Sequence, residues 1–170
     1  MSRIALISTG GTIEKTYEEL GGTLRNRVSV LDVMLAQLDL RGISSITRVP
    51  LMNKDSLEMT SEDHALIAEE VERWSRDHDG VVVVHGTDRL SQSGEATLTR
   101  LRAADGPRVP VVFTGAMRPF ELRRTDATQN LTEALLAVQV LAPGVYVSMH
   151  NRVLAFPGVR KDPVTRTFVK

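Results

Sequence analysis

The chain has 170 residues, of which 42% are hydrophobic and 25% charged, with 21 basic and 21 acidic side chains. This length suits one domain with a substantial core, and the balanced charge gives no indication of a nucleic-acid or anionic-membrane partner. The absence of cysteine excludes disulfides, thiolate metal sites and cysteine nucleophiles. The first apolar segment, residues 4–7, is too short for a signal peptide or a membrane span, so we expect a cytoplasmic protein.

The same apolar run at residues 4–7 predicts a buried strand that ends in a turn rich in glycine and hydroxyl groups. Thr9 and Thr12 flank Gly10 and Gly11, and glycine permits a close approach of the backbone to a ligand. The N–H groups around Gly11 are therefore candidates to face a developing oxyanion. An ordinary turn after a strand would give the same pattern.

Residues 13–27 contain the pair Gly21-Gly22, several charges and Tyr17, and they lack a helical repeat of apolar residues. This composition predicts a hairpin or a mobile flap. Tyr17 would close over a ligand if the segment is a lid, whereas a loop tyrosine more often has only a packing role.

A helix is expected over residues 28–40, where apolar side chains repeat at helical spacing. A short strand over residues 44–49 should follow. We expect Pro50 to end this strand, because proline cannot donate a ladder hydrogen bond.

Residues 51–60 form an expected loop, and they include Asp55 and Ser56. Polar loops are usually solvated surface, but the position of this one after a strand makes it a candidate binding loop. Thr60 or Ser61 should cap the next helix. The buried stripe expected for that helix consists of Leu66, Ile67, Val71 and Trp74.

Two histidines, His64 and His78, lie on or beyond the polar face expected for this helix, so we expect both to be exposed. No second histidine or acid lies at a spacing typical of a metal site. We therefore expect neither a metal nor another cofactor.

Four consecutive valines at residues 81–84 predict a central strand that is buried on both faces. His85, Gly86, Thr87 and Asp88 follow it directly. In open α/β sheets ligands bind at the carboxyl ends of the strands. The hydroxyl of Thr87 and the carboxylate of Asp88 are thus placed at the candidate site.

The rest of the chain continues the alternation of helices and strands. The expected helices are residues 91–103 and 126–141, the expected strands are 109–113 and 144–149, and residues 153–170 should form a loop and a closing hairpin. A doubly wound, mainly parallel sheet in three layers, of flavodoxin-like type, follows from this pattern.

A basic cluster, Arg118, Arg123 and Arg124, follows the strand at 109–113. It could bind an anion. With Glu121 and Asp126 nearby, we favour a loop held by ion pairs.

Four segments in this order resemble the amino-terminal domain of the bacterial L-asparaginase family. They are Thr9-Gly10-Gly11-Thr12-Ile13, residues 53–59, Val84-His85-Gly86-Thr87-Asp88 and Thr114-Gly115-Ala116-Met117-Arg118-Pro119. Family members usually carry a second, smaller domain. This chain reaches Lys170 without one. The resemblance therefore implies a short form of the family, with a single catalytic domain over residues 1–170 and a flap hairpin near its amino terminus.

The resemblance also implies roles for individual residues. Thr9 matches the nucleophile, Thr87, Asp88 and Lys161 match the set that handles protons, and Tyr17 is most similar to the flap tyrosine. Ser56 resembles the serine that holds the substrate α-carboxylate, although the next position, often polar in the family, is Leu57. The expected substrate contacts are Gly11, Asp55, Ser56, Gly86, Thr87 and Asp88.

The implied reaction is hydrolysis of L-asparagine to L-aspartate and ammonia through an acyl-enzyme on Thr9. A threonine hydroxyl becomes nucleophilic only when a base draws its proton, and Lys161 could do so in its uncharged form. N–H groups near Gly11 and Thr87 are the expected oxyanion donors. Direct attack by a water held on Thr87, an amidase for glutamine or another amide, and a non-catalytic amino-acid-binding module remain alternatives. Family members form dimers of dimers, so we expect a homo-oligomer, a dimer or a tetramer.

Overall fold

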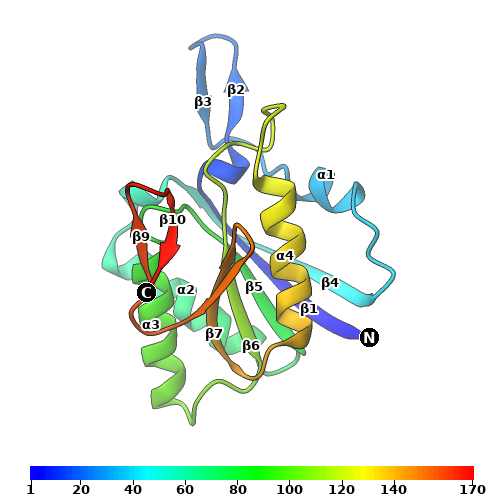
Figure 1. Cartoon of the computed structure of the whole chain (residues 1–170), viewed down its shortest axis with the longest axis vertical. Coiled ribbons are helices and arrows are strands. Elements are labelled where there is room, and N and C mark those ends of the chain that lie inside the picture. The colour runs from blue at the N-terminus through cyan, green and yellow to red at the C-terminus, as the bar shows by residue number, and fades with distance from the viewer.

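The computed structural model describes residues 1–170 as an α/β domain built on a six-stranded sheet (Figure 1). The strand order is β4–β1–β5–β6–β7–β8; the first five strands run parallel and β8 is antiparallel to β7. These strands are β1 (Ser2–Gly10), β4 (Ile43–Lys54), β5 (Gly80–Val84), β6 (Pro110–Thr114), β7 (Gly144–Met149) and β8 (Arg152–Ala155). The prediction of a doubly wound, mainly parallel sheet is confirmed.

Helices cover both faces of the sheet and complete three layers (Figure 1). They are α1 (Leu31–Ala36), α2 (Ser61–Trp74), α3 (Leu90–Ala103) and α4 (Ala127–Val140). Because successive side chains of a strand point to opposite faces, the valines of β5 divide between two cores. Val81 and Val83 belong to the core with α2 and α3, and Val82 and Val84 to the core with α1 and α4. Each buried valine contributes roughly 1.5–3 kcal/mol to stability.

The start of α2 matches the prediction, but one member of its expected stripe does not. The Thr60 side chain accepts a hydrogen bond from the N–H of Asp63, whose carboxylate accepts one from the N–H of Thr60. This reciprocal capping satisfies two N–H groups that the first helical turn leaves free. Leu66, predicted to be buried, is 41% exposed.

The prediction that Pro50 ends its strand was wrong. β4 continues through Pro50 to Lys54 and pairs with β1 along its length. The strand lies at the edge of the sheet, where a missing N–H leaves no partner unsatisfied. Its extension places Lys54 opposite Gly10, beside the predicted site.

The helix predicted over residues 28–40 was too long. The observed α1 covers only Leu31–Ala36, and within it only Leu31 and Met34 are buried. Packing therefore stabilises little more than one turn, and helices that short do not persist without tertiary contacts.

Two small hairpins complete the fold, and both match the predictions. The flap consists of β2 (Thr16–Glu18) and β3 (Thr23–Arg25), which project from the body of the molecule (Figure 1). Near the carboxyl terminus, β9 (Arg160–Asp162) pairs with β10 (Thr167–Val169).

None of the helices combines the length and the apolar character needed to cross a membrane.

Candidate active site

Two neighbouring strand ends place Thr9 beside the segment that begins at His85. Strands β1 and β5 are paired with Ser8 opposite Val84, and the Thr9 Oγ1 donates a hydrogen bond to the carbonyl oxygen of Val84 at 3.0 Å. The Thr9 side chain is 0% exposed. The hydroxyl therefore lies at the carboxyl ends of the central strands, as predicted, but other atoms cover it.

The glycines at these strand ends allow three segments to meet. Gly11 has φ 82°, and a Cβ atom on it would lie 2.4 Å from the Cα of Gly86. A Cβ atom on Gly86 would lie 2.6 Å from the Oγ of Ser56. Residues with larger side chains would push these segments apart, so the glycines are needed for their close approach.

Lys161 joins two predicted residues from a distant part of the chain. Its Nζ donates to the Oγ1 of Thr87 at 3.0 Å and to the Oδ1 of Asp88 at 2.7 Å. When the Lys161 amine carries its proton, this contact would stabilise negative charge on the Thr87 oxygen. The structure thus brings Thr87, Asp88 and Lys161 together. A cavity of about 530 Å³ adjoins them, lined by Asp88, Met117, Lys161, Pro163 and Arg166.

Oxyanion donors were expected among the N–H groups near Gly11 and Thr87, and the N–H groups of these two residues differ in availability. The N–H of Gly11 already donates to the carbonyl oxygen of Lys54 at 2.9 Å, whereas the N–H of Thr87 makes no hydrogen bond within the chain. An N–H that is already bonded cannot stabilise an oxyanion without breaking that bond. Of the two, Thr87 is the donor that this structure leaves available.

Ser56 begins a short 3-10 turn, Ser56–Glu58, and Asp55 is the capping residue before it. The Asp55 carboxylate accepts from the Nζ of Lys15 at 2.7 Å and from the N–H of Leu57, and these bonds, the first above all, lower the pKa of Asp55. Ser56 is buried and its Oγ accepts from the N–H of Arg89 at 3.4 Å. A second cavity, of about 470 Å³, reaches Asp55 beneath the flap.

Tyr17 lies apart from the other predicted residues. Its side chain is 56% exposed on the projecting flap, and its hydroxyl makes no hydrogen bond with any of them. Its N–H donates to the Oε2 of Glu121 at 2.5 Å, and the N–H of Phe120 donates to the carbonyl oxygen of Ile13. In this structure the flap therefore rests on the β6–α4 loop.

A buried histidine network behind Thr87 was missed. His64, expected to be exposed, is 8% exposed, and its Nδ1 lies 2.7 Å from the Oγ of Ser93. The same oxygen lies 2.7 Å from the Nε2 of His85, whose Nδ1 lies 2.7 Å from the carbonyl oxygen of Gly86. Since a carbonyl only accepts, the Nδ1 of His85 carries the proton and its Nε2 accepts from Ser93.

The sequence contained a signal for this burial. His64, Ile67, Ala68 and Val71 share one helical face, because residues at i, i+3, i+4 and i+7 lie together. All four are buried. Burial lowers the pKa of His64, and it lowers the pKa of His85 to about 4.

We expect His85 to make the free energy of unfolding depend on pH. Its pKa is about 4 in the folded chain against an ordinary value of 6.5, so between these values the unfolded chain binds a proton that the folded chain does not. The neutral imidazole's contribution is fully present above pH 6.5, and about 3 kcal/mol of it is lost as the pH falls to 4. Urea unfolding at several pH values should show a flatter profile for His85→Gln than for the wild type; parallel profiles would contradict this assignment.

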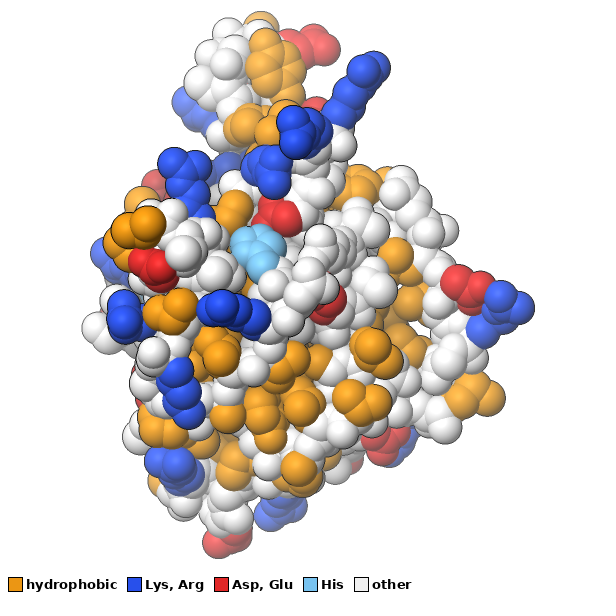
Figure 2. All heavy atoms as spheres, in the orientation of Figure 1, with side chains coloured by type: hydrophobic (Ala, Val, Ile, Leu, Met, Phe, Trp, Pro, Cys, Tyr) orange, Lys and Arg blue, Asp and Glu red, His pale blue; other side chains and the backbone are white.

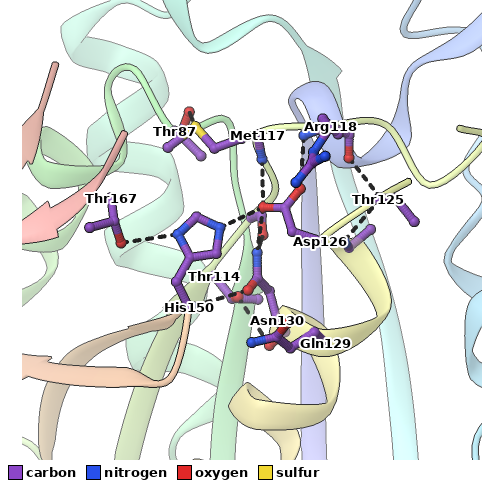
Figure 3. Close-up of polar contacts among 12 residues, drawn as sticks. Thr87, Thr114, Met117, Arg118, Thr125, Asp126, Gln129, Asn130, His150 and Thr167 are labelled. Atoms are coloured by element: carbon purple, nitrogen blue, oxygen red, sulfur yellow. Dashed lines mark hydrogen bonds and ion pairs between the residues drawn. The ribbon is translucent and has the colours of Figure 1, made fainter. Parts of the chain in front are cut away.

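The interpretation of the arginine cluster as a loop held by ion pairs was wrong. Arg118, Arg123 and Arg124 make no ion pair. The buried Asp126 holds the loop instead: its carboxylate accepts from the N–H of Met117 and of Arg118, each at 2.9 Å (Figure 3). Burial alone would raise the pKa of Asp126, but the hydrogen bonds that its carboxylate accepts lower the pKa below the ordinary value.

The chain contains no group of three or more histidines, cysteines, aspartates and glutamates that could hold a metal ion.

The fold and the site together define a three-layer α/β protein whose hydroxyl, lysine and aspartate side chains meet at the carboxyl ends of the central strands. The family described as "Asparaginase, N-terminal" matches residues 3–167. The chain therefore belongs to the asparaginase family.

The chain is similar to individual members of two kinds. The chain is 31% identical over 160 residues to the L-asparaginase of Thermococcus kodakarensis, a match that covers 94% of this chain and 47% of that protein. A solved structure of that enzyme superimposes with a TM-score of 0.82 at 30% identity, again over 94% and 47%. The chain is also 36% identical over 151 residues to a subunit of the glutamyl-tRNA(Gln) amidotransferase of Haloquadratum walsbyi, covering 86% of this chain and 33% of that one. It spans about half the length of these relatives, or less.

Proposed function

We propose that the protein is an amidohydrolase that converts L-asparagine and water to L-aspartate and ammonia, with Thr9 as the nucleophile. The observation that carries the proposal is the position of the Lys161 Nζ, within hydrogen-bond distance of both Thr87 and Asp88 and at the strand end next to Thr9. Lys161 comes from a segment far from Thr87 and Asp88 in the chain, and the strand before Thr87 pairs with the strand that ends near Thr9. A pocket that only binds an amide would not need a lysine, Lys161, hydrogen-bonded to the hydroxyl of a second threonine, Thr87.

In the proposed reaction the Thr9 oxygen attacks the amide carbon, and the N–H of Thr87 faces the oxyanion that forms. The Thr9 proton passes through Thr87 and Lys161, whose amine must be uncharged to accept it, to the leaving nitrogen. Ammonia departs and leaves an ester on Thr9, which water hydrolyses by the same proton path. Asp88 orients Lys161 and faces the substrate ammonium.

The proposal also requires Thr9 to become accessible. Thr9 is covered and its hydroxyl is bonded to Val84, so attack requires the hydroxyl to turn away from that carbonyl and to become accessible. We assign this rearrangement to the flap, which rests on the β6–α4 loop. Segments that gate a site commonly move on the microsecond to millisecond timescale.

A second candidate function is hydrolysis of glutamine or of another amide. The similarity to glutamyl-tRNA(Gln) amidotransferase subunits favours it. Glutamine has one methylene more than asparagine, and one methylene changes the free energy of binding in a pocket by only about 1–3 kcal/mol. The pocket would therefore discriminate only modestly between the two substrates. A non-catalytic binding module is disfavoured by the contact of Lys161 with Thr87.

Ammonia release separates these functions. Asparagine, glutamine and a simple primary amide are each supplied to the purified chain, with Thr9→Ala as the blank, and ligand binding is measured by calorimetry. Faster release from asparagine supports the first proposal, and faster release from another amide supports the second. Binding without any release would identify a binding module.

The expected homo-oligomer and cytoplasmic location remain proposals. Apolar side chains gather over α4, β7 and β8 on the face shown in Figure 2, and they include the exposed Leu136, Val140 and Val153. Surfaces of this kind commonly take part in association, which supports the proposal of an oligomer.

A further inference from the structure

The hairpin that carries Lys161 is small, and its position decides where the amine lies. Strands β9 and β10 have three residues each, with Lys161 opposite Phe168. A two-stranded hairpin of this size is marginally stable alone, so contacts with the body of the protein must fix it. One such contact is Phe168, which is buried in the core.

A second contact is polar and lies on the neighbouring residue. The Oγ1 of Thr167 is 3.0 Å from the Nδ1 of His150, and the Nε2 of His150 is 2.7 Å from the Oδ2 of Asp126 (Figure 3). An ionised carboxylate only accepts hydrogen bonds, so the Nε2 of His150 carries the proton. In the neutral ring the Nδ1 then accepts from the Thr167 hydroxyl.

The far end of this chain of hydrogen bonds, at Asp126, is held by further bonds. The Asp126 carboxylate also accepts from the N–H of Met117 and from the Nδ2 of Asn130 at 3.0 Å. The Sδ of Met117 lies 3.7 Å from the Oγ1 of Thr87. One carboxylate therefore fixes both the loop beside Thr87 and the hairpin that brings Lys161 to Thr87.

The backbone conformation of His150 sets the direction of its side chain. His150 has φ 55° and Asn151 has φ 60° in the tight turn between β7 and β8. A positive φ is uncommon outside glycine, and asparagine, aspartate and histidine are the residues that adopt it most readily. The turn points the imidazole between Asp126 and Thr167 (Figure 3).

We propose that His150 and Thr167 are positioning residues, which hold Lys161 against Thr87 and Asp88 by latching the β9–β10 hairpin to Asp126. The latch is the chain of contacts Asp126, His150 and Thr167. Its catalytic consequence rests on the proposed function, because it acts through Lys161. Neither positioning residue makes a hydrogen bond with Thr9, Thr87 or Asp88 in the structure.

Thr167→Val removes the hydroxyl and keeps the shape of the side chain. We expect kcat to fall by about 10-fold to 100-fold, because small displacements of a catalytic group have effects of this size, while KM changes by less than about twofold. Thr167→Ser keeps the hydroxyl and should restore most of the activity. Thr165→Val is the matched control: it removes a hydroxyl that bonds Asp162 within the same hairpin and should leave kcat near the wild-type value.

A double-mutant cycle distinguishes positioning from general damage. If Thr167 acts through Lys161, Thr167→Val should have no further effect on kcat in a Lys161→Ala background, because the group that it positions is gone. An equal loss in both backgrounds, or wild-type kcat in Thr167→Val, would overturn the proposal.

Hydrogen exchange of residues 160–169 tests the latch without any activity. Faster exchange in Thr167→Val and in His150→Phe than in Thr167→Ser supports it, and unchanged exchange overturns it. If the wild type releases no ammonia from any amide while exchange responds in this way, the proposed function fails and the latch stands.

Discussion

Thr9→Ala is expected to reduce amide turnover by about 10³-fold or more. Removing the nucleophile of a catalytic set whose members act together lowers kcat by at least about this factor. Binding of asparagine should change little, since the hydroxyl donates to Val84 and lies covered in the resting chain. Loss of that buried hydrogen bond should lower the free energy of unfolding by about 1 kcal/mol. Ammonia release, calorimetric binding and urea unfolding measure the three quantities separately.

Thr9→Ser is the control that keeps a hydroxyl at the same position. It should retain a substantial part of the turnover, whereas Thr9→Val, which keeps the shape and loses the hydroxyl, should behave like Thr9→Ala. Wild-type turnover in Thr9→Ala would remove Thr9 from the mechanism and favour a water held on Thr87. Loss of binding together with turnover would show that the residue has a structural role.

Gly11→Ala should be severe for both stability and turnover. The added Cβ would lie 2.4 Å from the Cα of Gly86, and the backbone at φ 82° is strained for any residue with a side chain. Left-handed strain and overpacking each cost about 1–3 kcal/mol, so the free energy of unfolding should fall by roughly 3 kcal/mol or more. The segment from Gly86 to Asp88 would have to move, and turnover should fall with it.

Gly42→Ala is the matched control for a glycine-to-alanine change. No atom lies within 4 Å of the Cβ position at Gly42, and its φ is not in the left-handed range. Its stability should stay within about 1 kcal/mol of the wild type, or rise slightly because the unfolded chain loses freedom. Urea unfolding of both variants provides the comparison. Equal, small effects at the two positions would show that the contact between Gly11 and Gly86 is not needed.

Much of the sheet could be predicted from local pattern. Four valines in succession are typical of a strand that is covered on both faces, and all four are buried in the structure. The flap and the carboxyl-terminal hairpin were also expected from their glycines and prolines. Pro50 misled the prediction, because its effect on a strand depends on whether that strand lies inside the sheet or at its edge.

The candidate site was predicted unevenly. Thr87 and Asp88 follow a buried strand directly, so their place at its carboxyl end could be inferred from the residues alone. Lys161 came from resemblance and not from pattern, since its hairpin acquires a position only by docking on distant parts of the chain. His64 was misplaced because the polar character of histidine was weighed above its helical spacing with Ile67 and Val71.

The sequence by itself determined the alternation of strands and helices and the two glycine turns that present hydroxyl groups, because periodicity, β-branching and backbone freedom are local properties. The tertiary structure alone decided that Lys161 meets Thr87 and Asp88, that Thr9 is covered, and that Asp126, His150 and Thr167 are joined. These relations depend on strand order, register and docking, which arise from contacts between residues far apart in the chain.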